Sequence, residues 1–206
     1  RTSLLAGVSH DLKTPLTRMR LQLAVMNNIE DIKTEFENEI IELENMIDTY
    51  LDFARNDREE QMVDASLFKL LQQAAKSSDP DGKQIHISIP PENLPVFPIQ
   101  VQSIRRALIN LFTNAMRYAG KASAQIQIFD DHSEIIIDDN GPGIPRDKRD
   151  EVVLPFTRLD NSRNNKTGGT GLGLSIAKNA ALNHGGELIL EDSPLGGLRV
   201  RLLLPL

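Results

Sequence analysis

The sequence predicts an antiparallel helical hairpin followed by an α+β sandwich, in which helices cover one face of a sheet. Two observations support this fold class. Apolar residues recur at steps of mostly three and four over residues 1–56, as they do in packed helices. From residue 66 onward, helical patterns are interspersed with short runs that alternate like strands. We therefore expect a hairpin at 1–58, a linker at 59–65 and a second domain at 66–206.

The predicted hairpin consists of two apolar stripes joined by a short polar segment. Because the joint at 27–33 is short, the two helices should run antiparallel. Two helices alone bury too little surface to be stable, so we expect a homodimer in which a second copy completes a four-helix bundle. The alternative is that the hairpin packs on the rest of its own chain. The stripes comprise Leu5, Val8, Leu12, Leu16, Met19, Leu23 and Met26, and then Phe36, Ile40, Leu43, Ile47, Tyr50 and Ala54.

The second domain is predicted from changes of period along the chain. Ser66 is a favourable N-cap for a helix that continues to Ser77. Helices and strands mixed in the observed order indicate the α+β sandwich. The further elements expected are helices at 100–118 and 174–184 and strands at 85–89, 125–129, 134–138, 187–190 and 198–204.

Composition excludes several classes of protein. The sequence has no cysteine, which excludes disulfides, thiolate chemistry and zinc–cysteine sites. A net charge of −6 and an aromatic content of 4% argue against a nucleic-acid partner. No run approaches the ~20 apolar residues of a membrane span, so we do not expect this stretch of chain to lie in a membrane. Because the sequence opens at Arg1 within a helical pattern, we expect that more chain precedes it.

The first candidate site surrounds His10, which lies opposite the apolar stripe of its helix. Thr14 follows one turn later on the same face, Asp11 is adjacent, and Pro15 should loosen the helix by removing a backbone hydrogen bond. One interpretation is a solvated histidine beside a harmless kink. The other is a nucleophile, because a neutral imidazole is abundant near pH 7 and Asp11 could hold one ring N–H. The segment alone supports both.

The second candidate site begins with Asn110 and Asn114, which share one helix face. Amide oxygens suit Mg²⁺, which usually keeps water and phosphate oxygens as its other ligands. Arg117 lies beside them and could meet phosphate oxygens. The alternative is an ordinary polar helix surface.

Two glycine-containing segments follow. In the run from Asp139 to Ile144, the aspartate ends a strand and could accept a hydrogen bond from an adenine amino group, or the run could be a simple tight turn. The run at 168–174 opens a helix and offers backbone N–H groups to an anion. It lacks the features of a Walker or Rossmann motif. Between them, residues 161–167 carry positive charge and no apolar anchors, which suggests either a lid over phosphates or a plain surface loop.

The segment Ser9-His10-Asp11-Leu12-Lys13-Thr14-Pro15-Leu16-Thr17-Arg18 resembles the H box of sensor histidine kinases. Together with the preceding residues 5–8, it is similar to the EnvZ-type osmosensor group. The resemblance implies that His10 is phosphorylated, that Asp11 assists as a base, and that Thr14 supports dephosphorylation of a partner response regulator.

The later segments resemble, in their order, the N, G1, F and G2 boxes of the Bergerat-type ATP-binding fold, which histidine kinases share with gyrase, Hsp90 and MutL. The run that resembles the F box is Pro155-Phe156-Thr157-Arg158-Leu159-Asp160. The resemblance implies ATP and Mg²⁺ as ligands. It places Asn114, supported by Asn110, on Mg²⁺ and Arg158 near the γ-phosphate. One departure is Arg117, where many relatives have lysine. The remaining nucleotide-binding residues that it implies are Arg117, Tyr118, Asp139, Gly141, Gly143, Gly169, Thr170, Gly171, Leu172 and Gly173.

The predicted function is that of the cytoplasmic core of a membrane-anchored bacterial sensor histidine kinase. It would phosphorylate His10 from ATP, pass the phosphoryl group to an aspartate of a response regulator and also dephosphorylate that regulator. One alternative is an ATPase clamp of the gyrase or Hsp90 groups, but these need a water-activating carboxylate that the N-box run Phe112-Thr113-Asn114 lacks. A non-enzymatic dimerisation module and a protein-serine kinase of the same fold are further alternatives, because the fold does not choose the acceptor.

Overall fold

The computed structural model describes residues 60–88, 96–159 and 170–206, together with five positions earlier in the chain. The chain divides into two compact units, Arg1–Arg55 and Asn56–Leu206. The remainder of the first unit, and with it the predicted bundle, lies outside the described residues. The five earlier positions are all helical and all belong to the predicted apolar stripes: Met19, Phe36, Ile40, Leu43 and Ile47.

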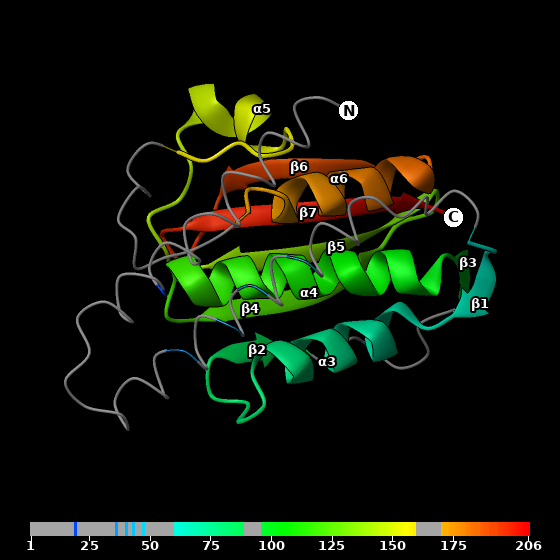
Figure 1. Cartoon of the computed structure of the whole chain (residues 1–206). Helices are drawn as coiled ribbons and strands as arrows, with labels where there is room; N and C mark the ends of the chain where they lie inside the picture. The colour runs from blue at the N-terminus through cyan, green and yellow to red at the C-terminus, as the bar shows by residue number, and fades with distance from the viewer. Residues whose placement is uncertain are drawn as a thin grey trace. The chain divides into compact units, whose positions relative to one another are not determined.

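The second unit is a two-layer sandwich, and the predicted α+β class is confirmed. Three helices lie on one face of a five-stranded sheet (Figure 1). Strand β2 runs parallel to β4, and the other neighbours are antiparallel. In sheet order the strands are β2 (Ile85–Ile87), β4 (Ala122–Ile128), β5 (His132–Asp139), β7 (Leu198–Pro205) and β6 (Glu187–Asp192), and the helices are α3 (Leu67–Ser78), α4 (Val101–Tyr118) and α6 (Gly173–Asn183).

The core lies between the helices and the central strand β5. Ile135 pairs with Ile126 of β4 and Leu202 of β7, and all three side chains are buried. Helix α4 presents buried residues at steps of three and four, including Leu108 and Leu111, so its amphipathic pattern predicted it correctly. Burial of such side chains stabilises the domain by roughly 1.5–3 kcal/mol each.

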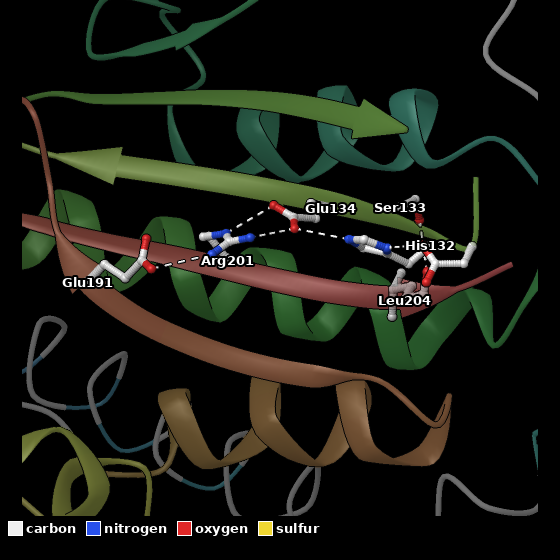
Figure 2. Close-up of polar contacts among 7 residues, drawn as sticks. His132, Ser133, Glu134, Glu191, Arg201 and Leu204 are labelled. Atoms are coloured by element: carbon white, nitrogen blue, oxygen red, sulfur yellow. Dashed lines mark hydrogen bonds and ion pairs between the residues drawn. The ribbon is translucent and has the colours of Figure 1, made fainter. Parts of the chain in front are cut away.

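The face of the sheet turned away from the helices carries a chain of charged contacts (Figure 2). Arg201 of β7 donates to Glu134 of β5 and to Glu191 of β6, and the Nε2 atom of His132 lies 3.1 Å from the same Glu134 carboxylate. Glu134 is only 2% exposed. Its hydrogen bond from Arg201 lowers the pKa of this carboxyl group, while the hydrogen bonds of His132 with Asp131 and Glu134 raise the pKa of the imidazole.

Several short elements were missed by the sequence patterns. Strands β1 (Val63–Ala65) and β3 (Phe97–Ile99) pair antiparallel as a separate two-stranded sheet, although residues 63–65 were expected in the linker. The 3₁₀ turn η2 (Arg146–Lys148) leads into the one-turn helix α5 (Arg149–Val152). Segments of three or four residues are too short to show a period. Within the described part of the chain, no helix is long and apolar enough to cross a bilayer.

Candidate active site

The two asparagines of α4 lie against the first residue of α6. A methyl group added at Gly173 would lie 3.0 Å from Asn114 Nδ2 and 3.4 Å from Asn110 Oδ1. The Nδ2 group of Asn110 donates to the Arg106 carbonyl at 2.9 Å, which leaves its Oδ1 as an acceptor or metal ligand. The structure therefore brings together residues of the predicted N and G2 boxes, about sixty positions apart in the sequence.

The start of α6 is suited to an anion. Leu172 is its N-cap residue and makes no side-chain capping hydrogen bond. Ser175 Oγ donates to the Leu172 carbonyl at 2.8 Å, so this hydroxyl does not satisfy the first N–H groups. Among the described residues, no side chain caps this end, and the N–H groups and the positive end of the helix dipole stay available to a ligand. The Leu172 side chain is fully buried, so only its backbone can contribute.

Asp139 is the last residue of β5, and among the described residues only one of its two carboxylate oxygens accepts hydrogen bonds. Its Oδ1 accepts from the backbone N–H groups of Gly141, at 2.8 Å, and Leu198, at 3.0 Å. Within the described ranges, its Oδ2 accepts no hydrogen bond, and the residue is 9% exposed. Two donors on one oxygen fix the orientation of the carboxylate, which leaves Oδ2 as an acceptor for an amino group such as that of adenine.

Gly197 is a site residue that the sequence reasoning missed. Its N–H donates to the Asp139 carbonyl at 3.2 Å. A methyl group at this position would overlap Asp139 Oδ1 and the Gly141 nitrogen. The glycine pair at 196–197 was a visible signal, but nothing in the sequence linked it to a residue some sixty positions earlier.

Residues of the predicted F and G2 boxes are joined by their backbones. The Phe156 N–H donates to the Gly171 carbonyl at 3.0 Å, and both residues have left-handed backbones, with φ of 65° and 68°. A methyl group at Gly171 would lie 2.9 Å from the Phe156 carbonyl carbon, so glycine is needed there for space as well as conformation. This contact, here named the Phe156–Gly171 clip, was not predicted. Arg158 follows it and is exposed.

The end of α4 is tied to the end of β5. The Asn140 Oδ1 atom accepts from the N–H groups of Gly120, at 3.1 Å, and Lys121, at 2.8 Å. A methyl group at Gly141 would lie 3.0 Å from the Tyr118 carbonyl oxygen. The last turn of α4, which contains Arg117 and Tyr118, therefore lies beside Asp139.

The remaining predicted site residues divide into two groups. Gly143 and Thr170 are half-buried and belong to the two glycine-containing segments described above. His10, Asp11, Thr14 and Gly169 lie outside the described residues. In the part of the chain that is described, no three His, Asp or Glu side chains gather as a metal site.

An open groove of about 840 Å³ lies elsewhere, between β6, α6 and the η2–α5 segment. None of the predicted site residues lines this groove, and its rim carries charges of both signs. The candidate site is therefore defined by converging polar groups at the ends of α4, β5 and α6, and not by this groove.

This arrangement is typical of a nucleotide-binding α+β protein, and comparison with known proteins names its class. Residues 99–206 match the family described as histidine kinase-, DNA gyrase B- and HSP90-like ATPases, and the chain belongs to this family. Residues 1–59 match the His Kinase A phospho-acceptor domain. The predicted resemblance to a sensor histidine kinase core is confirmed by this pair of domains.

Individual relatives and solved structures that the chain resembles are histidine kinases as well. The chain is 35% identical over 217 aligned residues to the sensor histidine kinase CpxA of Escherichia coli K12, covering 98% of this chain and 46% of the relative. The chain thus spans about half the length of this curated relative. The histidine kinase domain of the E. coli osmosensor EnvZ is similar with 31% identity and a TM-score of 0.55 over 72% of this chain and 91% of that one. Acinetobacter baumannii AdeS shares the fold, with a TM-score of 0.69, 19% identity and coverage of 95% and 97%.

Proposed function

We propose that the chain is the catalytic core of a sensor histidine kinase and transfers the γ-phosphoryl group of ATP to His10. The observation that carries the proposal is the convergence of three features in one place. These are the asparagine pair of α4, the open oxygen of Asp139 and the uncapped start of α6. The phospho-acceptor domain matched at residues 1–59 supplies the acceptor.

Each of these residues fits a part of Mg·ATP. Asp139 Oδ2 would accept from the adenine amino group, because its other oxygen is already held by two backbone donors. The first N–H groups of α6 would bind phosphate oxygens, and Arg158 would add charge near the γ-phosphate. Asn114, supported by Asn110, would bind Mg²⁺ through neutral amide oxygens. Mg²⁺ held there would neutralise charge on the phosphates.

The chemistry is an in-line transfer. The unprotonated ring nitrogen of His10 attacks the γ-phosphorus, the bond from phosphorus to the ADP oxygen breaks and a P–N bond forms. Asp11 would hold the opposite ring N–H and stabilise the positive charge that develops on the imidazole. The contribution of the protein is positioning and charge stabilisation.

The whole protein is proposed to work in a two-component pathway. Two chains would dimerise through their hairpins, and phosphohistidine would pass its phosphoryl group to an aspartate of a response regulator. Thr14 would serve the hydrolysis of that phosphoaspartate. The chain would be the cytoplasmic portion of a sensor anchored in the inner membrane, as the resemblance implies. An ATPase or a serine kinase using the same pocket is the alternative, and the phospho-acceptor match disfavours it.

Labelling with γ-³²P ATP tests the reaction. The wild-type chain should acquire acid-labile, base-stable label, and His10→Gln should lose essentially all of it. His86→Gln is the matched control. His86 is exposed on β2, which is an edge strand of the sheet, so this variant should label normally. Thr14→Ala should label normally but dephosphorylate the regulator more slowly. Label that survives in His10→Gln, or that resists acid as phosphoserine does, would contradict the proposal.

A further inference from the structure

Glu60 binds the first turn of α4 from outside the helix. Its Oε1 atom accepts from the Gln102 N–H at 2.7 Å, and its Oε2 atom accepts from the Ser103 N–H at 3.0 Å. Its backbone carbonyl accepts from the Gln100 side-chain amide at 2.9 Å. A carboxylate here satisfies two of the N–H groups that a helix leaves unpaired and also interacts favourably with the helix dipole.

The same end of α4 is also held by α6. The Gln100 N–H donates to His184 Nε2 at 2.9 Å, and His184 Nδ1 donates to the Ala180 carbonyl at 2.7 Å. The ring is therefore in the tautomer with its proton on Nδ1. We call the residues Glu60, Gln100 and His184 the anchor cluster.

The anchor cluster lies at the opposite end of α4 from the nucleotide residues. Fourteen helical steps separate Gln100 from Asn114, which corresponds to roughly 21 Å at 1.5 Å per residue. Glu60 also stands near the boundary between the two units of the chain, which falls after Arg55. Three residues later, Val63 pairs with Ile99 in the β1–β3 sheet.

We propose that Glu60 is a positioning residue that fixes, at the first turn of α4, the point where the chain enters the ATP-binding unit. The stretch of sequence that precedes Glu60, here called the tether, then limits how the ATP-binding unit can reach His10, a consequence that rests on the proposed function. If Glu60 is released, β1 becomes the next fixed point, and the tether gains residues 60–62. Three extended residues add about 10 Å of reach.

The inference is tested in the full chain with three variants. Glu60→Ala removes the carboxylate, Glu59→Ala removes the same charge one position earlier, and a Gly-Ser insertion between Arg58 and Glu59 lengthens the tether while leaving Glu60 in place. Each variant is measured for amide hydrogen exchange at Gln102 and Ser103, for affinity toward a fluorescent ATP analogue, and for the rate of His10 labelling at saturating ATP.

We expect Glu60→Ala to raise exchange at the two amides about tenfold, because they lose their acceptor. It should lower the labelling rate about two- to fivefold, because a longer tether reduces effective concentration. Nucleotide affinity should stay within about twofold of wild type. The insertion should reproduce the slower labelling without the change in exchange, and Glu59→Ala should resemble wild type.

Unchanged exchange in Glu60→Ala would overturn the inference. So would a loss of nucleotide affinity that matches the loss of rate, because that result would assign Glu60 to the pocket or to general stability. A wild-type chain that takes up no label would instead overturn the proposed function. In that case the exchange of Gln102 and Ser103 would still decide whether Glu60 holds the tether.

Discussion

The two ends of the ATP-binding unit differ in whether their polar groups have hydrogen-bond partners. At the end that contains the anchor cluster, Glu60 and His184 satisfy the backbone donors that precede and begin α4. At the other end, the start of α6 has no side-chain cap among the described residues, and Asp139 keeps one oxygen without a donor. Helices α4 and α6 both run between these two ends, so the difference lies in the residues placed at the helix termini.

Within the helix layer, the capped end therefore contributes to stability, and the uncapped end is left available for function. Satisfied caps typically contribute about 1 kcal/mol each to stability. An uncapped helix start and an open carboxylate oxygen forgo that contribution and keep their hydrogen bonds for a ligand. The proposed nucleotide end, called the nucleotide end below, is therefore the one whose polar groups lack partners among the described residues.

The strongest test of the comparison is Asp139→Asn. The amide oxygen can continue to accept from Gly141 and Leu198, so an NH₂ group replaces Oδ2 and would face the adenine amino group. We expect ATP affinity to fall about 100-fold, or roughly 2.7 kcal/mol, with little change in melting temperature. Competition with a fluorescent nucleotide measures this change. Asp130→Asn, at an exposed position, is the control, and retained affinity in Asp139→Asn would show that another group reads the base.

A smaller effect on binding is expected from Gly197→Ala. The added methyl group must displace the Asp139 carboxylate or the Gly141 backbone. We expect a loss of about 2–3 kcal/mol in the free energy of unfolding and about tenfold in ATP affinity. Gly120→Ala is the matched control, because a methyl group there meets nothing within 4 Å. Equal behaviour of the two variants in urea unfolding and nucleotide titration would refute the assigned role of Gly197.

The smallest expected effect is on the pH dependence of stability, and it concerns His132, which lies at the other end of β5 from Asp139. Hydrogen bonds with Asp131 and Glu134 raise the pKa of His132 in the folded state above its ordinary value of about 6.5. The folded protein therefore binds more protons, and this contribution to stability is full below pH 6.5 and lost as the pH rises through the folded pKa.

Urea unfolding between pH 6 and pH 8.5 measures the slope of the free energy of unfolding against pH. His132→Gln should flatten it while leaving ATP affinity unchanged, because the residue lies far from the nucleotide end. A variant whose stability keeps the wild-type dependence on pH would assign the slope to another group. At acid pH the sign reverses, because Arg201 lowers the pKa of Glu134, whose contribution is present above its unfolded pKa and lost as the pH falls.

Much of the fold could be predicted because its long elements carry clear periods. The pattern predicted a helix at 100–118, and α4 spans Val101–Tyr118. A strand was predicted at 134–138, but β5 spans His132–Asp139, because Glu134 and Asp138 bound the apolar run on which the prediction rested. Both carboxylates are nonetheless buried, because arginines of β7 pair with them across the sheet. A sequence pattern shows the charge but not the partner.

The candidate site was only partly predictable for a related reason. Asn114, Asp139 and the 168–174 segment carry recognisable local chemistry. Glu60 stood in a charged run that resembled a solvated linker, and its role depends on α4, some forty residues later. Phe156 belongs to the run that resembles the F box, but its left-handed backbone could not be predicted, because an aromatic residue rarely adopts a positive φ. Such residues are defined by long-range contacts, which propensity and period do not encode.

The Phe156–Gly171 clip has a consequence for changes in the length of this chain. It joins the two borders of the intervening stretch of sequence by a backbone hydrogen bond, which favours keeping the borders together. Doubling the length of a closed loop costs only about 0.6 kcal/mol in closure entropy. Evolution or protein engineering can therefore change the number of residues inside the clip at low thermodynamic cost while the residues on either side keep their places.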